Sequence, residues 1–405
     1  MSSEAAGAPD RTRPLERALV VVGIVVLAFN LRPAAISVGP LLDEVSTGLG
    51  MGAAETALLT TLPVLSFATL GALAPRIARA AGLHRSTLAA LVLVVVGLWL
   101  RTTVASGVLF LLLSFLALGG MAVANVLLPS LVKLHFPHRV GLMTSLYSTA
   151  LAVGITSSSV LTVPIAEAGA ELDWRRGLLA WALTAAVAVV PWLALARHDA
   201  HAEEPDRSLG AGAVARTRLG WVMAVFFGLQ SLQAYSIFGW MATIYRDAGS
   251  SAHEAGLLLG LVTGISIPLS LVIPWLTARV ERKGLLLTAI MACYPIGYVG
   301  LLVSPSTGAP LWALALGAGT CTFPFILTLI ALKARTPAGT AALSAFTQSA
   351  GYLISAVGPF GVGVLHAVSG GWTVPIVVLL ALCVPQYLLG LVAARPSLVE
   401  DELST

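Results

Sequence analysis

Residues 18–41 read ALVVVGIVVLAFNLRPAAISVGPL, and this stretch decides the class of fold. It is longer than the roughly 20 apolar residues that a helix needs to cross the hydrocarbon core of a bilayer. Its polar side chains are Asn30, Arg32 and Ser37. The stretch is too long for the apolar core of a secretory signal, and no small-residue cleavage site follows it. We therefore expect a membrane helix that stays in the mature protein.

The rest of the chain repeats this pattern. Hydrophobic residues make up 57% of the chain and charged residues 10%, and the mean hydropathy is +0.91. So little polar surface excludes a soluble protein. We predict an all-α membrane protein with twelve transmembrane helices, at residues 18–41, 56–75, 86–104, 107–132, 140–165, 177–196, 219–244, 255–278, 284–303, 310–332, 340–365 and 373–394.

The basic residues predict the orientation of these spans. Most of the 23 Lys and Arg residues lie in the N-terminal tail, near the C-terminus and in every second connection. The alternate connections hold Arg101, Arg175, Arg176 and Arg246. Because Lys and Arg gather on the cytoplasmic side, we expect a multi-pass protein of the bacterial inner membrane with both termini in the cytoplasm. The net charge of +4 follows from this topology and indicates no nucleic-acid partner.

The spans divide into two related halves. A polar interval at residues 198–218 separates six spans from six, and we read it as a cytoplasmic linker. Glu55 and Glu254 occupy corresponding places at the start of a span in each half, and so do Trp174 and Trp372 before one. Paired six-helix halves with a site between them are a transporter architecture. The expected units are a tail at 1–17, halves at 18–197 and 219–395 joined by the linker, and a tail at 396–405.

Polar side chains inside the spans are candidates for a solute pathway, because they are costly in hydrocarbon. The two Asn residues and four Gln residues of the chain all fall inside spans: Asn30, Asn125, Gln230, Gln233, Gln348 and Gln386. Hydrogen bonds between helices, at about 0.6 kcal/mol each, are an equally good explanation for any one of them. We assign Gln386, near the end of the last span, to that structural class.

Arg32 is the strongest single signal, because it is the only charged residue that the sequence places well inside a span. A buried guanidinium needs an anionic or strongly hydrogen-bonding partner. The alternative is that Arg32 snorkels to a membrane interface. Asn30 lies about 200° around the helix from Arg32, so we expect it to fix helix packing.

Acidic residues are missing from the core of every predicted span. Glu55 and Glu254 stand only at span starts. An Arg without a carboxylate partner favours an anionic or electron-rich solute. If protons are co-transported, the remaining carriers are the solute itself, Glu55, Glu254 or His366.

Two polar stripes extend the candidate site to the second half. Gln233 and Trp240 share a helix face in the seventh span, with Gln230 one turn earlier, and Gln348 and Tyr352 share a face in the eleventh. Tyr147 and Asn125 are candidates from the first half. Packing is the alternative for the aromatic members.

No sequence motif points to an enzyme, a cofactor or a metal. The pairs His135-x-x-His138 and His198-x-x-His201 lie in basic connections without acidic or Cys partners, so we read them as loop residues. The chain has no phosphate loop of the Walker type. Cys293, Cys321 and Cys383 are isolated inside spans and read as buried small residues.

Several short runs resemble a known family. They are Asn30-Leu-Arg-Pro-Ala-Ala-Ile-Ser-Val-Gly-Pro40, Thr60-Thr-Leu-Pro-Val64, Asn125-Val-Leu-Leu-Pro129, Gly141-Leu-Met-Thr-Ser-Leu-Tyr147, Gly228-Leu-Gln-Ser-Leu232 and Gln348-Ser-Ala-Gly-Tyr352. Together they resemble the cyanate/2-nitroimidazole transporter family of the major facilitator superfamily. The resemblance implies that superfamily's fold and alternating access. It gives importance to Asn30, Arg32, Asn125, Tyr147, Gln230, Tyr235, Trp240, Gln348 and Tyr352.

This sequence departs from the family pattern in two places. The acidic residue expected after the second span is replaced, with Pro75 before Arg76, and Trp240-Met-Ala-Thr stands where the family tends to have Trp-Leu-Pro. We expect a monomeric secondary transporter for a small anionic or polar solute, in contact with lipid. The alternatives are a multidrug-type exporter with a broad apolar pocket and a membrane sensor that binds its ligand without moving it.

Overall fold

The computed structural model describes residues 12–136, 139–169, 171–196 and 211–403, and these residues form helices and their connections. The prediction of twelve membrane spans is confirmed. The spans are Arg17–Gly48, Ala53–Ala78, Leu83–Arg101, Gly107–Val132, Leu142–Ala166, Trp174–Leu195, Arg218–Asp247, Ala252–Arg279, Lys283–Val303, Ala309–Leu332, Ala342–Ser369 and Thr373–Ala394. Most of the expected linker and the ends of both tails lie outside the described residues, as do His138, His198 and His201.

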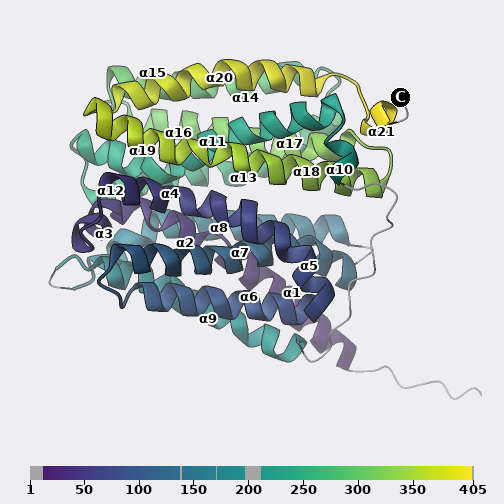
Figure 1. Ribbon diagram of the computed structural model, residues 1–405, viewed down its shortest axis with the longest axis horizontal. Coiled ribbons are helices and arrows are strands. Elements are labelled where there is room, and N and C mark those ends of the chain that lie inside the picture. The colour runs from purple at the N-terminus through teal and green to yellow at the C-terminus, as the bar shows by residue number, and fades with distance from the viewer. Residues whose placement is uncertain (1–11, 137–138, 170, 197–210, 404–405) are drawn as a thin grey trace, which may run out of the picture.

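A first group of helices forms the lower part of Figure 1. It consists of α1 (Thr12–Asn30), α2 (Pro33–Ile36), η1 (Gly39–Leu41), α3 (Leu42–Gly48), α4 (Ala53–Ser66), the π-helical turn η2 (Phe67–Gly71), α5 (Ala72–Ala81), α6 (Leu83–Arg101), α7 (Gly107–His135), α8 (Val140–Ala166) and α9 (Trp174–Leu195).

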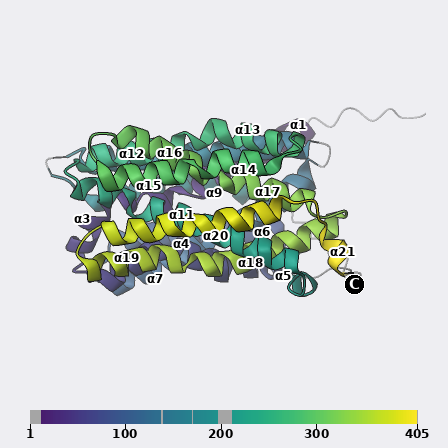
Figure 2. The same ribbon diagram turned by 90° about the horizontal axis from the view of Figure 1, so that it is seen from above.

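A second group forms the upper part of Figure 1, and Figure 2 shows that the long helices of both groups run along one common axis. The second group consists of α10 (Ala211–Val214), α11 (Arg218–Asp247), α12 (Ala252–Gly264), α13 (Ser266–Arg279), α14 (Lys283–Met291), α15 (Cys293–Val303), α16 (Ala309–Thr320), α17 (Thr322–Leu332), α18 (Pro337–Ser355), α19 (Val357–Ser369), α20 (Thr373–Ala394) and α21 (Val399–Leu403). The domain boundaries drawn from the sequence stay a prediction.

We call the end of the bundle where α1 begins and α21 lies the terminal end, at the right of Figure 1, and the other the opposite end. At the opposite end the two groups approach closely. A Cβ atom added to Gly39 would lie 2.8 Å from the carbonyl oxygen of Phe238 in the other group. One added to Gly363 would lie 2.7 Å from Ala57. Glycine at these places leaves room for the two groups to approach each other closely.

Four spans of the second group are each built from two helices, and proline explains where the first helix of each ends. Proline lacks the N–H that would bond to the carbonyl four residues earlier. The helices α12, α14, α16 and α18 end at Gly264, Met291, Thr320 and Ser355, each four residues before a proline: Pro268, Pro295, Pro324 and Pro359. A second helix begins two residues later in each case, so each span stays helical on both sides of the break.

The first span is also broken, where the sequence predicts one helix over 18–41. The helix α1 ends at Asn30, and Arg32 has φ −127° and ψ −27° before α2 begins at Pro33. The ring of a proline disfavours helical geometry for the residue before it. The break therefore lies at Arg32, the residue that carries the charge.

Candidate functional site

Arg32 lies between the two groups of helices, where its side chain contacts residues of both. Its Nη1 atom donates a hydrogen bond of 2.6 Å to the hydroxyl of Tyr235 on α11. The guanidinium carbon lies 5.1 Å from the centre of the Phe67 ring and 6.0 Å from that of Tyr235. These are the distances of cation–π contacts.

The guanidinium of Arg32 keeps unused capacity for hydrogen bonds. Its Nε atom is buried and has no partner among the residues that the structure describes, and none of their carboxylates forms an ion pair with it. An arginine side chain has five N–H donors, and a planar anion can use two of them at once. The arrangement can therefore accept a further electron-rich partner.

Aromatic rings from both groups surround this charge. Tyr352 on α18 stacks on Phe67 with 5.3 Å between ring centres, and lies 6.4 Å from Tyr235. The ring of Phe227 meets the edge of Tyr352 at 5.1 Å. We call Arg32, Phe67, Phe227, Tyr235 and Tyr352 the aromatic cluster. The resemblance pointed to both tyrosines, whereas the phenylalanines carry no polar atom that would mark them in the sequence.

A small cavity adjoins the cluster on the side of the opposite end. Its volume is about 20 Å³, and Tyr235, Thr60 and Gly39 belong to its lining. This is close to the volume of one water-sized probe, about 10–15 Å³. Helices α2, α4 and α11 therefore leave little free space there.

The two predicted glutamines of α11 differ in their surroundings. Gln233 is completely buried within the second group, where its Nε2 donates to the Leu379 carbonyl at 2.8 Å and its Oε1 accepts from Tyr298 at 2.6 Å. These bonds tie α11 to α20 and α15, so we leave Gln233 out of the proposed solute site. Gln230 donates to Ser231 at 2.7 Å, and its buried Oε1 has no partner in the described part of the chain.

Four other predicted residues make their described contacts away from Arg32. Trp240 donates to the Pro359 carbonyl at 2.8 Å and so joins α11 to α19. Gln348 donates to Ser344 one turn earlier at 2.8 Å. Asn125 and Tyr147 are half-buried on α7 and α8. No described hydrogen bond joins these four residues to Arg32, so their binding role stays a prediction.

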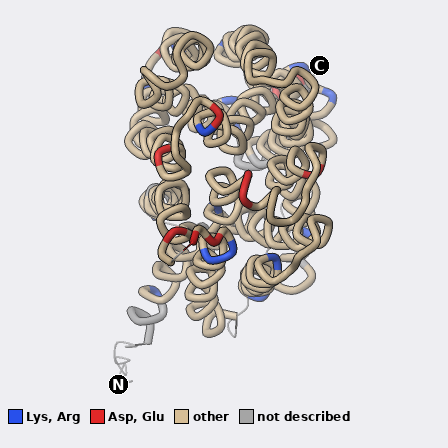
Figure 3. Tube along the Cα trace, turned by 90° about the vertical axis from the view of Figure 1, so that its left-hand side faces the viewer, with Lys and Arg blue, Asp and Glu red and all other residues tan. Residues whose placement is uncertain are grey.

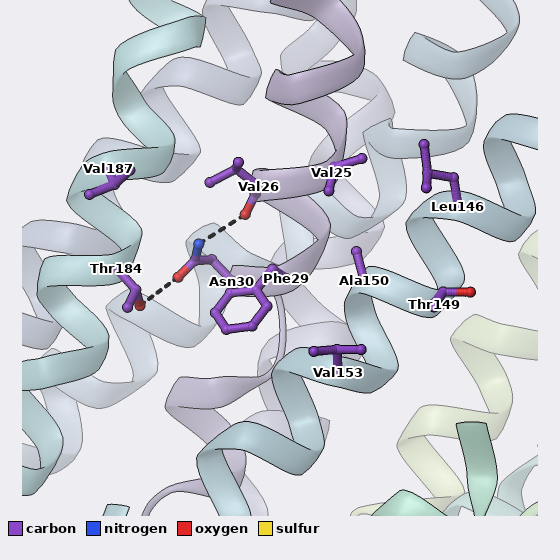
Figure 4. A pocket seen from close by; sticks show the side chains of 10 residues that line it. All are labelled: Val25, Val26, Phe29, Asn30, Leu146, Thr149, Ala150, Val153, Thr184 and Val187. Carbon is purple, nitrogen blue, oxygen red and sulfur yellow. Dashed lines mark hydrogen bonds between the residues drawn. The ribbon is translucent and has the colours of Figure 1, made fainter. Parts of the chain in front are cut away.

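Asn30 connects two helices of the first group. Its Nδ2 donates to the Val26 carbonyl at 2.9 Å, and its Oδ1 accepts from Thr184 on α9 at 2.8 Å (Figure 4). The expected packing role of this residue fits these contacts. They also occupy both ends of its amide.

We therefore predict that Asn30→Ala lowers the stability of the protein more than its affinity for solute. Loss of the two bonds should cost about 1–2 kcal/mol and lower the melting temperature in detergent. Asn125→Ala is the matched control, because Asn125 makes no side-chain hydrogen bond within the described residues and its loss should leave the melting temperature nearly unchanged. Equal melting of the parent and Asn30→Ala would contradict the prediction.

The candidates for proton coupling lie at the opposite end. The carboxylates of Glu55 and Glu254 accept from the backbone N–H groups of Gly52 at 3.0 Å and Ser251 at 2.8 Å, and so cap α4 and α12. His366 stacks on Trp372 with 3.9 Å between ring centres, and its buried Nδ1 has no described partner. Only His366 therefore keeps a free buried polar atom.

We expect Glu55→Gln and Glu254→Gln to leave any proton coupling unchanged. A Gln side chain can still accept the capping bond, so neither helix should lose its start. The measurement is solute uptake into proteoliposomes driven by a pH gradient. Loss of the pH-driven component in either variant would show that its carboxylate carries a proton.

The sequence interpretation made Arg32 the only charged residue well inside a span and counted Arg101 with the alternate connections, and the structure adds that the side chain of Arg101 is buried. Arg101 ends α6 and is fully buried, with 0% exposure. Its Nη2 lies 3.4 Å from the Ala34 carbonyl of α2, and its Nη1 lies 3.5 Å from Ser114. Hydropathy could not find this residue, because a charge at the end of an apolar segment is typical of a membrane interface.

An ion pair joins the groups at the opposite end. The Nη1 atom of Arg246 on α11 lies 2.7 Å from Glu44 and 3.4 Å from Asp43, both on α3. Figure 3 views the molecule from this end, with acidic and basic residues coloured. The sequence placed Arg246 on this side of the membrane but could not identify its partners.

Comparisons with known proteins agree with this architecture. The family profile of the Major Facilitator Superfamily matches residues 19–359. The 2-nitroimidazole transporter of Escherichia coli (strain K12) is 35% identical over 382 residues, which cover 94% of this chain and 96% of that protein. The cyanate transport protein CynX of the same bacterium is 29% identical over 350 residues, covering 86% and 90%.

A solved structure shows the same fold. A bacterial homolog of the human lysosomal transporter Spinster matches with a TM-score of 0.76 at 13% sequence identity, over 96% of this chain and 98% of that chain. The resemblance seen in the sequence is thereby confirmed, together with the fold class and a multi-pass location in the inner membrane. The chain belongs to the Major Facilitator Superfamily and is a membrane transporter, not an enzyme.

Proposed function

We propose that this transporter moves a small anionic or polar solute by alternating access, and that Arg32 binds the solute between the two groups of helices. The observation that carries the proposal is the state of the guanidinium. It bonds to a phenol at 2.6 Å, and among the described residues its buried Nε has no partner and the side chain forms no ion pair. A solute that offers negative charge or acceptor oxygens would supply what the side chain lacks.

The aromatic cluster supports a small, flat solute. The guanidinium is surrounded by the rings of Phe67, Tyr235 and Tyr352. Aromatic side chains are rigid, so they lose little conformational freedom when they contact a planar solute. The relatives are named for 2-nitroimidazole and for cyanate. One is a planar ring with acceptor oxygens and the other a small anion, so both fit an arginine beside aromatic rings.

We assign the terminal end to the cytoplasm, because most basic residues of the connections belong to it. Within this proposal the solute site consists of Arg32, Tyr235 and Tyr352, and Gln230 and Gln348 are further candidate polar residues from the second group. The protein acts as a monomer, since each group already supplies one side of the site.

Counterflow in proteoliposomes tests the proposal. Vesicles preloaded with unlabelled 2-nitroimidazole or cyanate should accumulate the labelled compound, and the same compounds should raise the melting temperature of the purified protein. Stabilisation without counterflow would identify a ligand sensor. Counterflow of large hydrophobic cations, with none of small anions or nitro-aromatics, would identify a broad exporter. Either outcome would overturn the proposal.

A further inference from the structure

A groove of about 500 Å³ opens on the side of the first group (Figure 4). Its walls are almost entirely apolar. Helices α1, α8 and α9 line it, and the apolar side chains of its wall include Val25 and Phe29 on α1, Leu146, Ala150 and Val153 on α8, and Val187 on α9. Neither Arg32 nor any other member of the aromatic cluster contributes to it, so it is separate from the proposed solute site.

The shape of the groove follows from one helix crossing. A Cβ atom added to Gly154 would clash with the backbone carbonyl of Phe29, so α8 touches α1 directly at this point. The groove lies on the terminal side of the crossing, beside Ala150 and Leu146. The contact at Gly154 closes one end of the groove.

The polar groups in the groove are already used by the protein. Asn30 bonds to Val26 and Thr184, Thr184 also bonds to the Trp181 carbonyl at 3.0 Å, and Thr149 has an interaction within the chain. A polar ligand would find no unpaired partner there. The groove therefore fits an apolar ligand.

The groove opens toward the surface that faces lipid. Leu146, Val153 and Val187 are 39%, 42% and 63% exposed, and all three belong to membrane spans. From Leu146 to Val153 the helix rises roughly 10 Å. One leaflet contributes about 15 Å of hydrocarbon, so the tail of a single lipid chain covers this distance.

A positive charge marks the entrance on α8. Arg139 precedes the first residue of the helix and is exposed, and Leu142 and Leu146 follow it three and seven positions later on one face. Arg139 therefore lies roughly 10 Å from the near edge of the groove along the helix. A lipid whose chain occupies the groove would place its phosphate at this depth, near the guanidinium.

We propose that the groove binds one acyl chain of a phospholipid from the leaflet at the terminal end, with the phosphate at Arg139. Apolar side chains that border an empty groove make no dispersion contacts on that side, and a lipid chain in the groove supplies these contacts. The bound chain keeps α8 apart from α1, the helix that leads directly into Arg32. The lipid is thus a structural ligand of the part of the fold that carries the solute site.

Photocrosslinking tests this site without any substitution. The full chain is placed in nanodiscs that contain phosphatidylglycerol with a photoreactive group in the middle of one acyl chain. We expect crosslinks to concentrate on the peptides of α1, α8 and α9 that contain residues 25–29, 146–153 and 184–187. Crosslinks spread evenly over the lipid-facing helices, α20 included, would reject the site.

Substitutions then test the groove itself. Ala150→Phe fills it and should remove most crosslinks to α8, whereas Val384→Phe adds the same ring to the exposed face of α20 and should leave them unchanged. Arg139→Gln should keep the crosslinks but remove a preference for phosphatidylglycerol over phosphatidylcholine. A folded Ala150→Phe protein that keeps its α8 crosslinks would overturn the proposal, and if this variant does not fold, the map of the parent protein still decides.

Discussion

Arg32→Ala should abolish tight solute binding while the protein still inserts and folds. A hydrogen bond to a charged group contributes about 1.5–3 kcal/mol, so its loss should weaken binding by roughly ten- to a hundredfold or more. Arg32→Lys keeps the charge but loses the planar fork, and its affinity should fall between those of the parent and the Ala variant. Isothermal titration with 2-nitroimidazole or cyanate, together with counterflow, measures both effects.

The matched control is Arg176→Ala at the opposite end. The Arg176 side chain is 43% exposed and forms an ion pair of 4.0 Å with Asp173. Exposed pairs contribute little, so this variant should bind solute like the parent. If Arg32→Ala also binds and transports like the parent, Arg32 is structural and the case for an anionic or electron-rich solute loses its main support.

Arg246→Ala should open the opposite end of the transporter. The side chains of Arg246 and Glu44 are only 23% and 19% exposed, and their ion pair of 2.7 Å joins the two groups of helices. Its loss should shift the equilibrium between conformations by roughly ten- to a hundredfold, because the bond stabilises the arrangement in which the two groups meet at this end. Glu44→Gln should act in the same direction but less strongly, since its amide still accepts a hydrogen bond.

The rate at which an introduced thiol is labelled measures this opening. Ser37 is completely buried near the opposite end. In a variant without the native cysteines, Ser37→Cys should react slowly with a membrane-impermeant maleimide, and much faster once Arg246→Ala is added. Exchange of the two charges, with Arg246→Glu and Glu44→Arg together, should restore slow labelling. If Arg246→Ala leaves the labelling rate of Ser37→Cys unchanged, the ion pair does not hold this end closed.

The membrane spans could be predicted from the sequence because they depend on local composition. A run of about 20 apolar residues must cross the bilayer as a helix, since no other local structure satisfies its backbone groups there. The breaks within the spans have an equally local cause. Pro268 and Pro359, for example, each remove the bond to the residue four positions earlier, where α12 and α18 end.

The partners of the polar side chains could not be predicted in this way. Gln233 and Gln230 lie three residues apart on one helix, yet Gln233 has its polar atoms paired inside the second group and Gln230 keeps one oxygen free. The difference depends on which neighbouring helices face each side chain. Only helix packing decides that.

The sequence by itself determined the twelve spans and an arginine within the first span, because hydropathy acts over a few residues, and its short runs indicated the superfamily by their resemblance to known members. The tertiary structure decided that Arg32 meets Tyr235 and Phe67, that Arg101 is buried, and that Arg246 bonds to Glu44. These contacts join residues from separate helices. They depend on the rotation and crossing of each helix, which packing fixes over the whole molecule and no short stretch of sequence encodes.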